Sequence, residues 1–244
     1  MKNKKFFYLQ YNKINWKNQE KTKINSFIYE RIIKNIILLY KGDSIAIFDI
    51  GFGIGFFVRA LIHALRERYK NIIIEGCEPS RLNYKHFLTR KPKRLRGGIT
   101  LRTHQKTFQD TKTETKFDFI TAVYVLPHFA SDDLEDFVRK AHLMLKERGK
   151  FILVTANESY LANKLKTETD LSIETRVFMY KGKQYKEILH YSDIPKIGKV
   201  IDYDREEAYN ISLFESNKFK MMHKENINDN GFLAALFVFE KVKS

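Results

Sequence analysis

The sequence contains very little cysteine, with Cys77 as its single example. One thiol cannot form a disulfide within the chain, so a fold held together by internal disulfides is excluded and a reducing compartment is expected. The 244 residues, of which 43% are hydrophobic, are enough to bury a sizeable core. We therefore expect one globular domain that is stabilised by core packing.

Long hydrophobic runs are also missing. A helix that spans a bilayer needs about 20 consecutive apolar residues, and no segment of the sequence approaches that length. The Lys-rich start lacks the apolar core of a signal peptide. We therefore expect a cytoplasmic protein with no membrane partner. The seven histidines show no metal-ligand spacing, so no metal site is expected.

Acidic residues are outnumbered by basic ones. The chain has 44 Lys and Arg against 29 Asp and Glu, which gives a formal net charge of +15. Such an excess favours anionic partners such as nucleic acid. However, Lys is abundant along the whole chain, and the one concentrated cluster, Arg90 to Arg96, falls in an expected loop. Charge runs of this kind are usually solvated turns, so nucleic acid is a possible but not a favoured partner.

The most informative stretch runs from Ser44 to Glu78. Residues 44–50 and 72–77 have the apolar, β-branched composition of buried parallel strands. Between them, apolar residues recur at spacings of three and four over 56–69, as in an amphipathic helix. The stretch therefore predicts a strand, helix, strand unit of the kind that binds nucleotides.

A glycine-rich turn joins the first strand to this helix. Gly51 and Gly53 are expected to adopt backbone angles closed to other residues and to let a ligand lie against the main chain. Gly55 is expected to permit close packing of the helix against the strand. Glu78 follows the second strand, where its carboxylate would bind a ribose diol. The turn reads Asp49-Ile50-Gly51-Phe52-Gly53-Ile54-Gly55.

The glycine spacing distinguishes between nucleotides. Dinucleotide sites prefer G-x-G-x-x-G, whereas this turn reads G-x-G-x-G with Phe56 in place of the third glycine, so a nicotinamide dehydrogenase is the least favoured reading. Together with Glu78, the turn resembles motifs I and II of the class I S-adenosylmethionine (SAM)-dependent methyltransferases, notably the small-molecule types 11 and 12. The resemblance implies SAM as the cofactor. It implies binding by Asp49, Gly51, Phe52, Gly53, Gly55, Glu78 and Pro79.

Later segments extend the resemblance to residues 44–157. A third strand is expected over 99–103, and after it Thr107 and Phe108 are the candidates to hold the adenine ring, although Phe108 is equally compatible with a core position. An apolar strand that ends at Val123 and runs into a Leu-x-His turn resembles motif IV, in which the residues face both cofactor and acceptor.

This resemblance places Val123 beside the cofactor and Tyr124 and His128 beside the substrate. A tyrosine at a strand end usually serves packing, and a lone histidine usually satisfies its own hydrogen bonds. Ligands of open α/β sheets bind at the carboxyl ends of the parallel strands. Because Tyr124 and His128 are expected at such an end, a functional role is more strongly indicated for them than for an average tyrosine or histidine.

The resemblance implies a Rossmann-like, doubly wound α/β sheet of seven strands in the order 3-2-1-4-5-7-6, with the last strand antiparallel. Residues 1–43 are expected to form an N-terminal helical cap segment, with a helix over 27–40, and 44–244 the methyltransferase domain. Tyr11 and Trp16 of the cap segment are candidate substrate residues. A helix that begins at Ser131 is expected to stop at Gly149, before a fifth strand.

The segment after the fifth strand carries no motif. Residues 176–180 and 185–190 predict a β-hairpin, inserted within 170–191 as a lid or a dimer contact. Ser192 to Pro195 is expected to open a helix, and 209–214 and 232–240 are expected to be the last two strands. The oligomeric state stays open between monomer and homodimer.

Methyl transfer from a sulfonium is an in-line displacement in which the protein mainly aligns the acceptor and excludes water. A neutral amine attacks unaided, whereas a hydroxyl needs a general base such as His128. Tyr124 would orient the acceptor or place its ring near the sulfonium. The expected activity is therefore methyl transfer from SAM to nitrogen or oxygen of a small molecule. Two alternatives stay open: a tRNA or rRNA methyltransferase that uses the basic loop, and a catalytically silent SAM-binding scaffold subunit.

Overall fold

The computed structural model describes residues 23–92, 95, 97–157, 173–194, 198–229 and 232–243. The chain divides into two compact units, which are described separately. The first comprises the residues up to Thr121 together with Met144–Gly149, and the second comprises Ala122–Leu143 and the residues from Lys150 onward.

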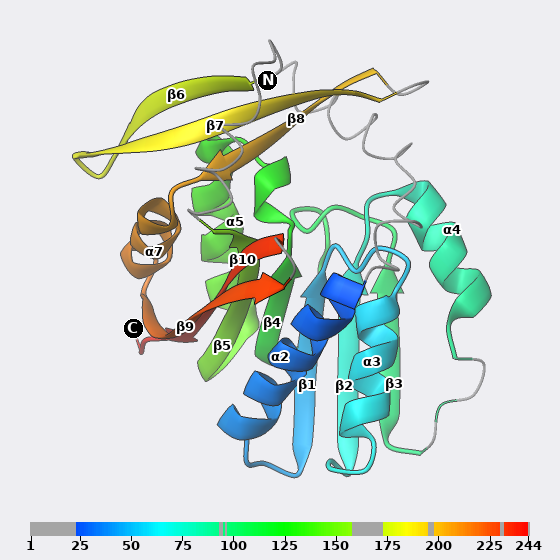
Figure 1. The fold of residues 1–244 in the computed structure, drawn as a ribbon. Coiled ribbons are helices and arrows are strands. Elements are labelled where there is room, and N and C mark those ends of the chain that lie inside the picture. Colours follow the sequence, from blue (N-terminus) through cyan, green and yellow to red (C-terminus); the bar gives the residue numbers. More distant parts are fainter. Residues whose placement is uncertain are drawn as a thin grey trace. The chain divides into compact units, whose positions relative to one another are not determined.

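A seven-stranded sheet has the order β3-β2-β1-β4-β5-β10-β9 (Figure 1). β1 pairs with β2 and β2 with β3 in parallel, whereas β10 is antiparallel to both β5 and β9. This is the expected Rossmann-like order with its antiparallel last strand, so the predicted fold class is confirmed. The strands are β1 Ser44–Ile50, β2 Asn71–Cys77, β3 Ile99–His104, β4 Phe117–Val123, β5 Leu145–Ala156, β9 Phe219–Asp229 and β10 Phe232–Lys241.

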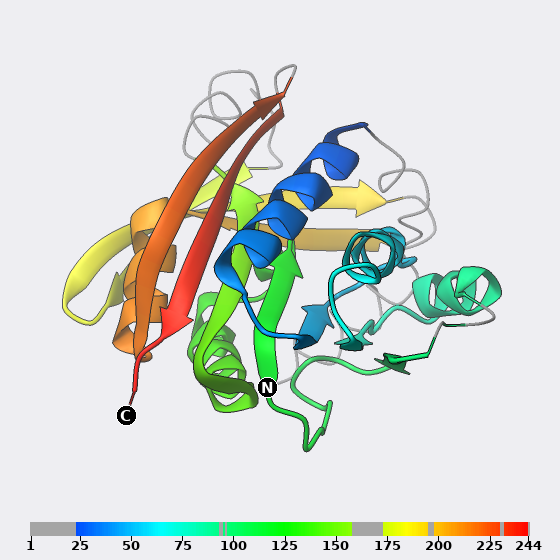
Figure 2. The ribbon, with the colours of Figure 1, turned by 90° about the horizontal axis from the view of Figure 1, so that it is seen from below.

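In the described part of the first unit, which begins at Lys23, three helices accompany these strands. They are α2 (Lys23–Leu39), α3 (Phe56–Leu65) and α4 (Arg81–Arg90). In Figures 1 and 2, α2 and α3 lie side by side on one face of β1 and β2, and the rings of Tyr29 and Phe57 approach to 5.1 Å. The buried face of α3 is the one that the helical spacing predicts. It consists of Phe57, Val58, Leu61, Ile62 and Leu65.

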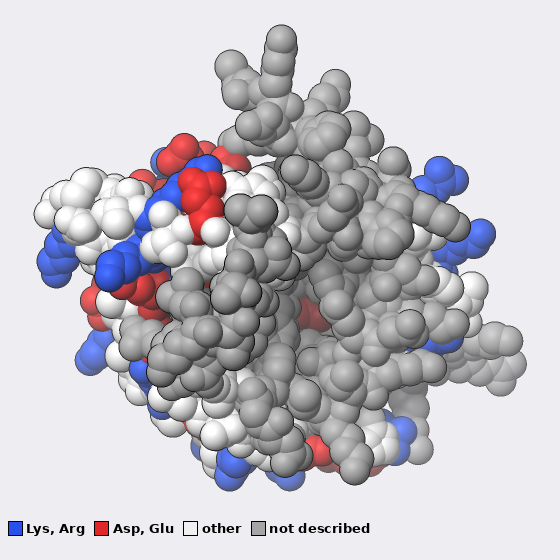
Figure 3. Space-filling view, turned by 45° about the horizontal axis from the view of Figure 1, so that its top comes forward, with Lys and Arg blue, Asp and Glu red and all other residues white. Residues whose placement is uncertain are grey.

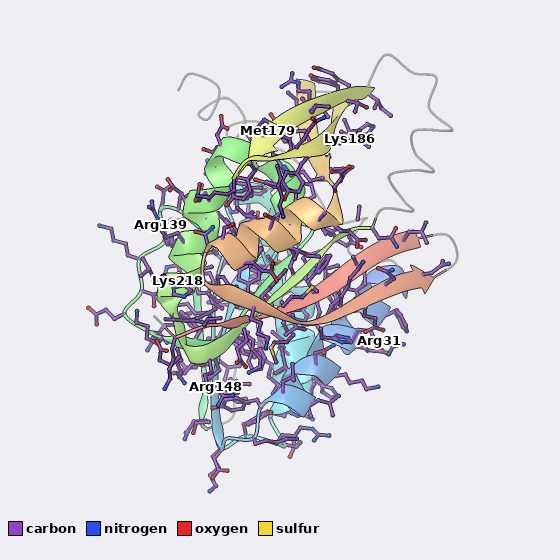
Figure 4. The ribbon with its side chains drawn as sticks, turned by 90° about the vertical axis from the view of Figure 1, so that its left-hand side faces the viewer. Arg31, Arg139, Arg148, Met179, Lys186 and Lys218 are labelled. Atoms are coloured by element: carbon purple, nitrogen blue, oxygen red, sulfur yellow. The ribbon has the colours of Figure 1, made fainter. Side chains whose placement is uncertain are left out.

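The second unit contains a separate antiparallel sheet in the order β6-β7-β8. Its strands are β6 (Ile173–Tyr180), β7 (Lys183–Ile194) and β8 (Gly198–Arg205). β6 and β7 form the predicted hairpin, and Met179 and Lys186 mark these two strands in Figure 4. Within the described residues of this unit, the helices are α5 (Ser131–Met144), the short 3-10 helix η2 (Leu126–His128) and α7 (Glu207–Ser216).

Two predicted elements of the second unit are wrong. Residues 209–214 are part of α7, because the buried Asn210 is followed by the buried Leu213 and Phe214, at the spacings of three and four that form one face of a helix, and burial does not alternate as in a strand. Residues 192–194 continue β7 instead of opening a helix, and Pro195 lies outside the described residues. The missing strand of the central sheet is β9, which follows α7.

The end of α5 is also earlier than predicted. The helix ends at Met144, and Gly149 lies inside β5. A Cβ atom at Gly149 would come within 2.9 Å of the Lys146 carbonyl oxygen and 3.0 Å of the Phe117 carbonyl oxygen. Gly149 therefore permits a close approach of backbone to backbone rather than stopping a helix.

Candidate functional site

The glycine-rich turn after β1 has the backbone that the sequence predicts. Gly51, Gly53 and Gly55 have φ angles of 68°, 57° and 81°, in the left-handed region that glycine adopts without steric cost. The Gly51 N–H donates to the Cys77 carbonyl oxygen at 2.8 Å, so the turn is tied to the end of β2. No side chain projects from these three positions, which fits a ligand lying against the main chain.

Gly55 has a different packing partner from the one expected. A Cβ atom there would lie 2.3 Å from the ring of Phe87, which is fully buried on α4. Gly55 thus makes room for α4, whereas the sequence suggested that it brings α3 close to a strand. Phe52 packs against the same ring at 4.8 Å between centroids. Its side chain is therefore in the core, and its backbone alone remains as a candidate ligand contact.

Glu78 joins the turn to the start of α4. Its buried carboxylate accepts the Gly53 N–H at 2.9 Å through Oε2 and the Ser80 N–H at 2.7 Å through Oε1. The Asn83 side-chain amide also donates to Oε1, at 3.5 Å. The structure therefore brings together the two residues that the sequence assigned to one nucleotide site, Gly53 and Glu78. Pro79 follows them and is half-buried.

Asp49 is the second buried carboxylate of this region. Its Oδ1 accepts a hydrogen bond from the Thr121 hydroxyl of β4 at 2.7 Å. Thr121 lies 72 residues further along the chain. The acidic side chain at the end of β1 is therefore positioned by a neighbouring strand, a contact that no local sequence pattern predicted.

The two candidate adenine residues have unequal surroundings. Phe108 is buried and packs against Phe48 at 5.8 Å between centroids, as the alternative of a core position describes. Thr107 is half-buried, and its hydroxyl donates to the Asp110 carboxylate at 2.7 Å. Thr107 thus closes a local turn after β3, and Phe108 forms the core beneath that turn.

The thiol of Cys77, next to Glu78, is buried. Burial raises the pKa of the Cys77 thiol from its ordinary value of 9.0 to about 12. A thiol with this pKa is protonated at neutral pH and is a poor nucleophile. Cys77 is therefore a core residue and not a candidate for covalent catalysis.

In the second unit, the end of β4 carries the candidate substrate residues. Val123 is half-buried and ends the strand, and Tyr124 follows it with a φ angle of 55°. A tyrosine in the left-handed region is uncommon and costs about 1 to 3 kcal/mol, a cost that often marks functional sites. The Tyr124 N–H donates to the Val154 carbonyl oxygen of β5 at 2.9 Å.

His128 ends η2 and has a partner that the sequence analysis missed. Its Nδ1 atom lies 2.8 Å from Oδ1 of Asp202, on β8. The side chains are 15% and 30% exposed, so the pair is shielded but accessible. Asp202 is 74 residues away in sequence, within a strand that the sequence did not predict, and only the tertiary structure could reveal the contact.

A second residue of β8 holds the turn around His128. The Arg205 guanidinium donates to the carbonyl oxygens of Leu126, at 3.3 Å, and of Phe129. Its Nε atom lies 3.3 Å from Glu187 and donates to the Ser131 hydroxyl at 2.9 Å. The side chains of Arg205 and Glu187 are 2% and 9% exposed. Burial lowers the pKa of Arg205, and the negative charge of Glu187 opposes this shift.

Other predicted positions are only partly covered by the structure. Tyr11 and Trp16 lie outside the described residues, as do Lys93, Arg94 and Arg96 of the basic cluster. Arg90 and Lys91 are exposed. On the described part of the face in Figure 3, Lys and Arg side chains are mixed with Asp and Glu. Over the described ranges, no three His, Cys, Asp or Glu residues are grouped to hold a metal ion, and no helix is long and apolar enough to cross a membrane.

Comparisons with known proteins agree with this fold and turn. A family model described as a methyltransferase domain matches residues 24–193. No curated protein matches the sequence significantly. The similar solved structures include the 1,6-didemethyltoxoflavin-N1-methyltransferase of Burkholderia thailandensis, bound to 1,6-didemethyltoxoflavin and S-adenosylhomocysteine. It has 11% sequence identity and a TM-score of 0.64, over 99% of this chain and 90% of that one.

Two further structures are similar over most of the chain. A SAM-dependent methyltransferase of Clostridium acetobutylicum has 14% identity and a TM-score of 0.61, over 94% of this chain and 96% of that one. The magnesium protoporphyrin IX methyltransferase of Synechocystis with bound S-adenosylhomocysteine has 13% identity and a TM-score of 0.61, over 89% of this chain and 83% of that one. At these identities the likeness establishes the fold.

The seven-stranded order and the glycine turn define the class I SAM-dependent methyltransferase fold. Within that class, the chain belongs to the methyltransferase-domain family, whose model covers more than half of it. The protein is therefore a SAM-dependent methyltransferase.

Proposed function

We propose that this methyltransferase transfers the methyl group of SAM to nitrogen or oxygen of a small molecule. The observation that carries the proposal is the hydrogen bond between the Gly53 N–H and Glu78, because it joins the glycine turn to the acidic strand end, the two elements that would form the nucleotide site. The Burkholderia enzyme, whose structure contains 1,6-didemethyltoxoflavin, supports a small-molecule acceptor for a chain of this fold and length.

The proposed cofactor residues belong to the ends of β1, β2, β3 and β4. The backbone from Gly51 to Gly55 would face the cofactor, with Asp49 positioned beneath it by Thr121. Glu78 would bind the ribose hydroxyls with the carboxylate that now accepts the Gly53 N–H. Thr107, Phe108 and Val123 would border the adenine, with Phe108 contributing from the core.

The proposed acceptor residues are Tyr124 and His128, with Tyr11 and Trp16 of the N-terminal segment. Ligands of open α/β sheets bind beyond the carboxyl ends of the strands, and Tyr124 follows such an end directly. Bound SAM supplies an electrophilic methyl group, so these side chains need only align the acceptor, exclude water and, for a hydroxyl, accept a proton.

The experiment that tests this proposal follows labelled methyl from SAM into the metabolites, RNA and proteins of a cell extract. Glu78→Ala and Gly53→Arg serve as controls, because the first removes the carboxylate and the second puts a large side chain where the cofactor would lie against the main chain. We expect label in the metabolite fraction with the wild type and none with either variant. Label in RNA would favour the RNA methyltransferase, and SAM binding without any transfer would favour the scaffold subunit.

A further inference from the structure

The chemistry of the contact between His128 and Asp202 fixes the state of the imidazole. A carboxylate accepts hydrogen bonds and does not donate them. At 2.8 Å from Asp202 Oδ1, the Nδ1 atom of His128 is therefore the donor and carries the proton. In a neutral ring the lone pair is then on Nε2, since the partner of one nitrogen sets the role of the other.

The same strand that orients the ring also holds the backbone around it. Arg205 donates to Leu126 O and Phe129 O, which lie on either side of His128 in sequence. Glu187 of β7 balances the buried charge of Arg205, and Ser131 donates to that carboxylate at 2.8 Å. Within the second unit, β8 thus fixes both the backbone and the ring of His128.

We propose that Asp202 is a positioning residue, which holds His128 with Nδ1 protonated so that Nε2 accepts a proton from a hydroxyl acceptor. This rests on the proposed function and specifies its substrate class as an alcohol or a phenol. A neutral amine needs no base to attack a sulfonium methyl group, whereas a hydroxyl gains nucleophilicity as its proton leaves. An imidazole whose tautomer is set by a neighbouring carboxylate suits the hydroxyl acceptor.

The step balances in atoms and charge. The hydroxyl oxygen forms a bond to the methyl carbon while the bond from that carbon to sulfur breaks, and sulfur keeps the electron pair. The hydroxyl proton passes to Nε2, which forms an imidazolium next to Asp202. The products are a methyl ether and S-adenosylhomocysteine, and the imidazolium then returns its proton to solvent.

The tautomer can be measured without knowing the acceptor. In protein labelled with ¹⁵N-histidine at a pH where the ring is neutral, His128 should give a protonated Nδ1 and an unprotonated Nε2, with His128→Gln assigning the signals. Asp202→Ala should remove this preference and Asp202→Glu should restore it. Asp132→Ala, at an exposed position of α5, is the matched control and should change nothing. A protonated Nε2 in the wild type, or the same tautomer in Asp202→Ala, would overturn the proposal.

The substrate class is tested with the metabolite fraction as the acceptor source. Asp202→Ala should lower kcat about 10- to 100-fold, less than the roughly 10²- to 10⁴-fold contribution of a general base, because the variant keeps His128 and loses only its orientation. KM for SAM and SAM affinity should be unchanged, and Asp202→Glu should recover part of the lost kcat. The labelled product should be a methyl ether. An N-methyl product, or an unchanged kcat, would contradict the proposal. If no metabolite is labelled, the proposed function fails, while the NMR result still decides whether Asp202 positions the ring.

Discussion

The glycine turn of the first unit and the η2 turn of the second unit are built in different ways. The glycine turn depends on its own residues and on Glu78, only 25 residues beyond Gly53. The η2 turn depends on Arg205 and Asp202, more than 70 residues away. A turn held by local backbone geometry leaves a sequence motif, whereas a turn held by distant side chains leaves none.

The largest effect is expected from a substitution that removes the distant side chain holding the η2 turn, that of Arg205. Arg205→Met should lower the free energy of unfolding by about 3 to 5 kcal/mol, because Glu187 would be left as an uncompensated buried charge. Urea denaturation measures this loss. The double variant Arg205→Met with Glu187→Gln should lose less than Arg205→Met alone, and an equal or larger loss would show that the ion pair is not the main stabilising contact.

The next effect breaks the local geometry of the glycine turn. Gly55→Ala should destabilise the fold by about 3 kcal/mol, because a Cβ atom would meet Phe87 and the residue has a φ angle of 81°. Gly97→Ala is the control, since nothing lies within 4 Å of the Cβ position there. Similar unfolding midpoints for both variants would contradict this account of the turn.

An effect that is smaller per pH unit concerns the end of β2, to which the glycine turn is hydrogen-bonded. Because burial raises the pKa of Cys77 to about 12, the folded chain retains a proton that the unfolded chain releases near its ordinary value. This contribution is complete below about pH 9, and above it the free energy of unfolding should fall by about 1.4 kcal/mol per pH unit until about pH 12. Denaturation between pH 8 and 11 measures the slope. Cys77→Ala should have a shallower slope, and equal slopes would exclude the thiol as the cause.

The smallest effect concerns a distant contact at the glycine turn, the hydrogen bond from Thr121 to Asp49. It tests whether this turn, too, depends in part on a side chain far away in sequence. Thr121→Val removes the hydroxyl that donates to Asp49 and should cost about 1.5 kcal/mol, the low end of the range for a hydrogen bond to a charged group. The midpoint temperature of thermal unfolding and the affinity for SAM should both decrease modestly. Thr121→Ser keeps the donor and should be close to wild type; a loss as large as that of Thr121→Val would assign the effect to packing.

The sequence predicted the parts of the molecule that follow local periodicity. The first βαβ unit and the β6–β7 hairpin are where spacing and turn residues placed them. The antiparallel orientation of the last strand followed from the resemblance to the methyltransferase fold and is confirmed. Residues 209–214 were misassigned because a short run of large apolar residues fits a strand or a helix until its neighbours are known. Asp202 and Arg205 were missed because neither belongs to a motif, and their roles follow from which strand lies beside η2.

The central claim is that Gly53 and Glu78 form the SAM site, and calorimetric titration with SAM tests it most directly. We expect the wild type to bind one SAM per chain, and Glu78→Gln and Gly53→Arg to bind at least about tenfold more weakly, with circular dichroism spectra like that of the wild type. Glu78→Gln retains the size of the side chain but loses the charge that would accept the ribose hydroxyls. Wild-type affinity in both folded variants would contradict the claim.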